Sequence, residues 1–184
     1  VAAVDAWPYE TDPAEAVSAM AGAGVLAAIA PWAEAAALTA LVAIEAETGA
    51  APRWQRRLAA LGPTAQAGEA WRLSKAERRE LAALEAARAD APKLPPAGLA
   101  HLHGIAAARD ALLLRAAEGQ AVPPGLEADL MRGGTATFPI GAQALMEAGV
   151  PAGPALGQAL AKLKWRWAEA DCGLSAADLL AALA

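Results

Sequence analysis

The chain has little of what a β-sheet needs. Its 184 residues include seven valines, four isoleucines and six threonines, together with a single Phe and a single Tyr. Strands favour β-branched and aromatic side chains, whereas helices favour alanine and leucine, which here number 57 and 24. This composition excludes a sandwich, a barrel or a parallel-sheet protein. It predicts an all-α fold, a multi-helix bundle of short helices.

Cysteine, long apolar runs and leader features are also scarce. The single cysteine, Cys172, excludes an internal disulfide and a thiolate-rich zinc site, and it indicates a reducing cytoplasm. The longest uncharged run, between Glu15 and Glu34, is interrupted by two glycines and a proline. Because a bilayer helix needs about 20 largely apolar residues, we expect no membrane span. The first ten residues lack Lys, Arg and an apolar core, so we expect no signal peptide, and the initial Val1 favours a fragment of a longer polypeptide.

Charge is distributed unevenly along a chain whose net charge is −5. Residues 1–52 carry seven acids and no Lys or Arg, whereas residues 53–79 carry seven bases against Glu69 and Glu77. An acidic chain is not expected to bind nucleic acid tightly through its overall field, since phosphate neutralisation dominates that affinity. The basic segment can still form a local patch.

Residues that begin and end helices divide the chain into short segments. The predicted helices run from Asp12-Pro13 to Gly22 or Gly24, between Pro31 and Gly49, from Pro52 to Gly62, from Ser74 to about Asp90, from Leu99 to Glu118, and from Pro123 to Gly133-Gly134, with three more after Phe138. Residues 92–98 contain three prolines and are predicted to link a helical segment at 1–91 to a second at 99–184.

Residue patterns with catalytic chemistry are absent from the sequence. It has no Walker loop, no dinucleotide-binding glycine pattern and no metalloprotease motif, so we assign no catalytic residue. His101 and His103 would point about 200° apart on a helix, and for that reason we predict no metal site there. Cys172 lacks a histidine partner that would activate its thiol, and we interpret it as unreactive.

A basic stripe is predicted on the helix that begins at Ser74. Lys75, Arg78 and Arg79 share one face of that helix, while its leucines face away. The stripe is a candidate for contact with RNA phosphates. The alternative is a solvated surface whose charge is offset by Glu77 and Glu80.

A second basic cluster surrounds Trp165. Its neighbours Lys162, Lys164 and Arg166 are all cationic, and an aromatic ring among bases can stack on RNA. The alternative is that Trp165 packs on the last helix. On the same helix a different stripe is apolar and predicts a core face, composed of Leu156, Leu160, Leu163 and Trp167.

The segment from Phe138 to Gly157 carries the most specific motif, F-P-x-G-x-x-x-L-x-x-x-G-x-P-x-G-P-x-L-G. It resembles the C-terminal signature of bacterial tRNA nucleotidyltransferases and poly(A) polymerases, the CCA-adding family. The run RLSKAER at 72–78 resembles the opening of a body helix in that family. Weaker similarities at 56–61 and 12–31 follow in matching order, so the resemblance covers nearly the whole chain. Gln143 stands where the family usually has an acid.

The resemblance implies the helical body and tail of a longer enzyme that acts on RNA 3′ ends, with a fold like that of class II tRNA nucleotidyltransferases. The family's head, which uses Mg²⁺ with CTP or ATP, has no counterpart in this sequence, so no cofactor is expected here. The implied function is to bind the acceptor and TΨC arms of tRNA during CCA or poly(A) addition. A self-contained helical module for protein interaction or dimerisation is the alternative.

One further candidate contact lies within the motif. Gly153-Pro154 is expected to open a helix, and the N–H groups at a helix start can bind a phosphate. The alternative is a tight turn that docks two helices, because glycine and proline at these places also serve as helix caps.

Overall fold

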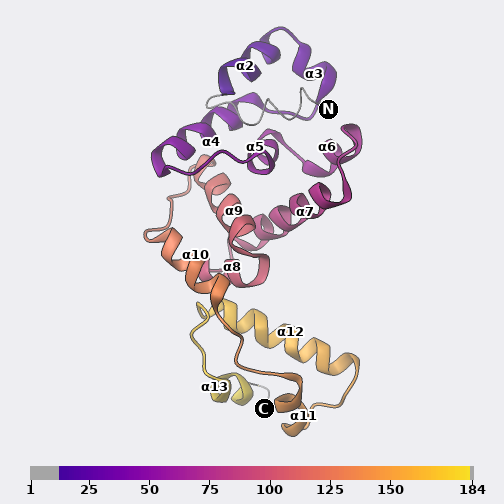
Figure 1. Ribbon diagram of the computed structural model, residues 1–184, viewed down its shortest axis with the longest axis vertical. Coiled ribbons are helices and arrows are strands. Elements are labelled where there is room, and N and C mark those ends of the chain that lie inside the picture. Colours follow the sequence, from indigo (N-terminus) through magenta and orange to yellow (C-terminus); the bar gives the residue numbers. More distant parts are fainter. Residues whose placement is uncertain (1–12, 183–184) are drawn as a thin grey trace. The chain divides into compact units, whose positions relative to one another are not determined.

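The computed structural model describes residues 13–182, and every regular element in them is a helix (Figure 1). The predicted all-α fold is therefore confirmed for this part of the chain. None of its helices is long and apolar enough to cross a membrane. The elements are α2 (Ala14–Gly22), α3 (Val25–Ile29), α4 (Ala35–Thr48), α5 (Trp54–Leu61), α6 (Thr64–Ala70), α7 (Lys75–Asp90), α8 (Pro96–His103), α9 (Ile105–Ala117), α10 (Leu126–Thr135), α11 (Ala142–Glu147), α12 (Pro154–Glu169) and α13 (Ala176–Ala181).

The chain divides into two compact units, each built from two stretches of sequence. Unit 1 comprises Val1–Arg88 and Asp110–Val122, and unit 2 comprises Ala89–Arg109 and Pro123–Ala184. This division differs from the predicted segments at 1–91 and 99–184. The predicted linker at 92–98 also differs, because α8 begins at Pro96 and its next two residues are buried. A proline at the first helical position lacks only an N–H that has no partner within the helix.

In unit 1, α4 packs against α2 and α5. Leu38 and Leu41 of α4 are buried, and Gly49 ends the helix in the left-handed conformation. The helix predicted to begin at Ser74 opens with a capping box, since the Ser74 N–H donates to Glu77 Oε2 at 2.7 Å and the Glu77 N–H donates to Ser74 Oγ at 3.2 Å. The Asp12 cap predicted for α2 lies outside the described residues.

In unit 2, α8 packs against both α10 and α12. A Cβ atom at Gly98 would lie 2.1 Å from the Ala168 carbonyl oxygen of α12, and one at Gly133 would lie 2.0 Å from the Ala97 carbonyl oxygen of α8. Only glycine permits these approaches of backbone to backbone. The helix predicted to end at Gly133-Gly134 ends one residue later, at Thr135, so both glycines lie in the last turn of α10.

The predicted helix from Leu99 to Glu118 is also interrupted. Gly104 adopts φ 84° and ψ 154°, and it separates α8 from α9. Those angles are incompatible with a continuous right-handed helix, so the glycine acts here as a break.

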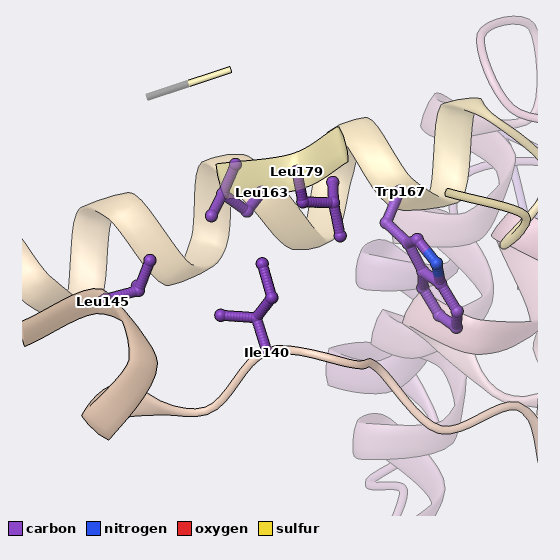
Figure 2. Close-up of a cluster of buried hydrophobic side chains, with 5 residues drawn as sticks. All are labelled: Ile140, Leu145, Leu163, Trp167 and Leu179. Carbon is purple, nitrogen blue, oxygen red and sulfur yellow. The ribbon is translucent and has the colours of Figure 1, made fainter. Parts of the chain in front are cut away.

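The core of the C-terminal part of unit 2 contains Ile140, Leu145, Leu163, Trp167 and Leu179. Ile140, on the segment before α11, points toward Leu163 and Leu179 (Figure 2). The apolar face predicted on α12 is confirmed, since Leu163 and Trp167 are buried and two further members, Leu156 and Leu160, pack against the cluster. The three helices predicted after Phe138 are present as α11, α12 and α13.

Candidate nucleic-acid interface

The lysines and arginines of the described residues separate into two groups according to whether an ion pair engages them. The engaged group consists of Arg53, Arg56, Arg57, Arg88, Lys93, Arg109 and Arg132. Among residues 13–182, no carboxylate lies within ion-pair distance of the second group, which consists of Arg72, Lys75, Arg78, Arg79, Arg115, Lys162, Lys164 and Arg166. Seven of these eight fall in two short segments, at 72–79 and 162–166.

Part of the first group forms a buried network in unit 1 that sequence reasoning missed. Arg56 Nε donates to Glu45 Oε1 at 2.9 Å, and its Nη1 donates to Asp110 Oδ1 at 2.8 Å. Arg57 binds the other oxygen of Glu45 through Nε at 3.0 Å and Nη2 at 2.9 Å. Arg53 Nε donates to Asp110 Oδ2 at 2.9 Å. Three of the seven bases in the segment 53–79 therefore contribute no free charge to a surface patch.

Apart from Arg53, whose side chain is 35% exposed, the network is almost completely removed from water. Arg56, Asp110, Arg57 and Glu45 are 0%, 1%, 3% and 4% exposed. Burial raises the pKa of Asp110, whereas the charges and hydrogen bonds of Arg56 and Arg53 oppose that shift. Such an arrangement holds α4, α5 and the unit 1 part of α9 together, because a charge left without its partner would be buried at high cost.

The three predicted contact residues of α7 lie together on its surface and define the α7 patch. Lys75, Arg78 and Arg79 are exposed, whereas the opposite face of the helix is buried through Leu81, Leu84 and Ala87. The segregation of charged and apolar faces thus agrees with the helical periodicity.

The two acids expected to offset the α7 patch are hydrogen-bonded elsewhere. Glu77 accepts hydrogen bonds from the Ser74 backbone and side chain, which lower its pKa. Glu80 accepts a hydrogen bond from Gln55 Nε2 of α5. Neither acid forms an ion pair with a cation of the patch within the described part of the chain. Hydrogen bonds from these neutral donors do not remove the charge of a carboxylate, so contact of the patch with RNA stays a prediction beside its alternative, a surface whose charge is offset locally.

The second predicted set defines the α12 patch, in unit 2. Lys162, Lys164 and Arg166 are exposed, and Trp165 is half-buried with its indole N–H donating to Glu169 Oε1 at 2.7 Å. The tryptophan that belongs to the core cluster with Leu179 of α13 is Trp167, whose Nε1 donates to the Leu174 carbonyl oxygen at 3.1 Å.

Gly153 is exposed and precedes α12 with φ 111° and ψ −151°. This region of backbone space is essentially restricted to glycine, and Pro154 occupies the first helical position. The turn therefore accounts for both residues without a ligand, and phosphate binding there stays a prediction. Other motif positions also have packing roles, since Phe138 packs edge-on against Trp167 with ring centroids 5.6 Å apart.

The two histidines and the cysteine considered as candidate site residues lie in three different environments. His103 Nε2 lies 3.0 Å from Asp90 Oδ2, and the His101 ring packs edge-on against Trp167 with centroids 4.7 Å apart. Burial is the main cause of a raised pKa at the Cys172 thiol, which agrees with its interpretation as unreactive. Within residues 13–182, no group of three or more His, Cys, Asp or Glu side chains is placed to hold a metal ion.

Comparisons of this chain with protein families, with curated proteins and with solved structures find no match.

Proposed function

We propose that this chain is a tRNA-binding helical part of a nucleotidyltransferase that acts on RNA 3′ ends, by CCA or poly(A) addition. The observation that carries the proposal is the α7 patch, where three exposed cations share one helix face and the neighbouring acids are hydrogen-bonded to other groups. The motif at 138–157 and the run at 72–78 support the choice of tRNA as the partner. Catalysis belongs to other parts of such an enzyme, as do Mg²⁺ and the nucleotide.

The expected binding mode is contact with the RNA backbone. Exposed Lys and Arg side chains without a protein carboxylate retain the capacity to bind phosphate oxygens. Helical RNA presents its phosphates and 2′-hydroxyls more readily than its base edges, so such contacts read shape rather than sequence. The acceptor and TΨC arms of tRNA offer this kind of surface. We also assign the α12 patch and Gly153 to RNA contact, as separate candidates in unit 2.

The test is the salt dependence of tRNA binding by the 184-residue chain. Each phosphate neutralised contributes about −0.9 to the slope of log K against log salt, so three contacts contribute about −2.7. The Lys75→Ala/Arg78→Ala/Arg79→Ala variant should bind a tRNA transcript more weakly, and its slope should be shallower by about this amount. All three side chains are exposed, so the variant should keep the helical circular dichroism of the unchanged chain.

Lys93→Ala provides the control, because it removes one exposed charge outside both patches. Equal slopes for the triple variant and the unchanged chain would refute a role for the α7 patch. A chain that does not bind tRNA but self-associates in sedimentation would favour the alternative, a protein-interaction or dimerisation module. The specific observation for that alternative is the exposure of Val25 and Ile29 on α3, at 45% and 50%.

A further inference from the structure

The turn that connects α6 to α7 places an arginine where a helix end favours glycine. Arg72 has φ 52°, one of three described non-glycine residues with a positive φ. The Leu73 N–H donates to the Gly68 carbonyl oxygen at 3.2 Å, and the Arg72 N–H donates to the Glu69 carbonyl oxygen at 3.4 Å. These two bonds define a Schellman motif in which Arg72 occupies the left-handed position.

Packing of the side chain does not explain why an arginine occupies this left-handed position. Arg72 is exposed, and it forms no ion pair within the described residues. The part of the turn that packs is the next residue, Leu73, which lies against the cluster of Leu58, Ala67 and Leu81. Glycine would serve the backbone better at position 72, so the arginine stands there at a conformational cost.

The position of Arg72 connects it with the α7 patch. The Gly68 carbonyl oxygen accepts the hydrogen bond that closes the turn, and a Cβ atom at Gly68 would lie 3.5 Å from Cγ of Arg78. The turn of Arg72 and the aliphatic stem of Arg78 therefore meet at the same residue of α6. With Lys75 and Arg79, this makes four cations without an ion pair within eight consecutive residues of the described chain.

We infer that Arg72 is a further RNA-binding residue, which donates hydrogen bonds to a backbone phosphate of the RNA bound at the α7 patch. The inference rests on the proposed function. A guanidinium is suited to this role, because its planar set of N–H donors can bind two phosphate oxygens at once. The Schellman motif fixes the backbone from which the side chain projects, and the exposed patch supplies the neighbouring charges.

Arg72→Gly separates stability from binding, because the two effects have opposite signs. Glycine relieves the left-handed backbone, so the midpoint of thermal unfolding should rise by about 4 °C. Loss of one phosphate contact should make the salt slope for a tRNA transcript shallower by about 0.9. If the variant and the unchanged chain bind equally at about 1 M salt, the variant then binds about eightfold more weakly at about 0.1 M. Arg72→Asn, which also tolerates the left-handed region, should show the same binding loss, and Arg72→Lys should retain the slope.

The outcomes distinguish this inference from the proposed function. If the Lys75→Ala/Arg78→Ala/Arg79→Ala variant loses slope while Arg72→Gly and Arg72→Asn bind with the slope of the unchanged chain, the inference is overturned and the proposed function stands. If the unchanged chain does not bind the transcript, both are overturned. If the chain binds but the triple variant binds as the unchanged chain does, the inference is overturned together with the role of the α7 patch. Lys93→Ala again serves as the control for the loss of one positive charge.

Discussion

Gly133→Ala tests whether a single close approach sets the spacing of two helices in unit 2. A Cβ atom at Gly133 would lie 2.0 Å from the carbonyl oxygen of Ala97 and 2.5 Å from its carbonyl carbon. Ala97 is 0% exposed and its backbone is part of α8, which also packs against α12 through Gly98. The added methyl group therefore meets backbone on a helix that is held from two sides, and no side-chain rotation can relieve the contact.

The magnitude follows from two opposing effects. Non-bonded carbon and oxygen atoms rarely approach closer than 3.0 Å, so α8 and α10 would have to separate by roughly 1 Å. Forcing additional volume into a packed core costs about 1–3 kcal/mol. Alanine in a helix interior recovers about 0.8–1 kcal/mol relative to glycine. We expect a net loss of about 0–2 kcal/mol, and its midpoint of about 1 kcal/mol lowers the midpoint of thermal unfolding by about 4–8 °C for a unit of this size.

Gly157→Ala is the matched control. Gly157 lies within α12 of the same unit, and a Cβ atom there would meet no atom within 4 Å. This variant should show only the gain in helix propensity and melt slightly above the unchanged chain. Thermal unfolding followed by circular dichroism at 222 nm measures both variants. A Gly133→Ala variant that melts at or above the temperature of Gly157→Ala would refute the reasoning.

Two further predictions concern ionisable groups, buried Glu45 and partly buried His101. Glu45→Gln should destabilise unit 1 by about 3 kcal/mol in urea unfolding, because it leaves Arg56 and Arg57 buried without their carboxylate. The control is Glu47→Gln at an exposed position of the same helix, which should change stability by less than about 0.5 kcal/mol. Similar losses of stability in both variants would contradict the role of burial. Burial and, less strongly, the Lys164 charge lower the pKa of His101 below 6.5. Below that pH the unfolded state binds the proton more readily than the folded state, so the stability of unit 2 should fall as pH drops. His101→Phe keeps an aromatic ring against Trp167. The variant should flatten the dependence of the melting midpoint on pH between about 7.5 and 5. Parallel curves for the variant and the unchanged chain would show that His101 does not cause the pH dependence.

Local signals predicted the positions of most helices. The capping box at Ser74, the left-handed Gly49 and the turn at Gly153-Pro154 act through neighbours in sequence, so a single sequence contains all the information that they use. The break at Gly104 and the close helix packing at Gly133 were not predicted, for the opposite reason. One breaks a helix and the other lies inside one, and the difference depends on whether a second helix approaches, which a local pattern does not record.

The same limitation applies to predicting which arginines are buried in ion pairs and which are exposed. Arg56 and Arg78 have similar sequence surroundings, each beside a second arginine and close to a leucine. Arg56 is buried because Glu45 and Asp110 reach it from 11 and 54 residues away. A partial signal was present, since Glu45 interrupts the apolar face of its helix and Asp110 stands directly before an apolar run. An acid at such a position predicts a buried cationic partner, although it does not identify which one.

The distribution of ion pairs also bears on the positive site that the proposed function requires of an acidic chain. The acids that neutralise the arginines of α5 come from outside the basic segment, and they are used where water is excluded. The acids inside the segment are engaged differently, since Glu77 is bonded to Ser74 at the start of α7. Net charge and the count of arginines therefore describe the surface incompletely, because the local field depends on where all the charges lie. The salt slope of RNA binding should accordingly follow the number of unpaired cations in the patch rather than the total charge of the chain.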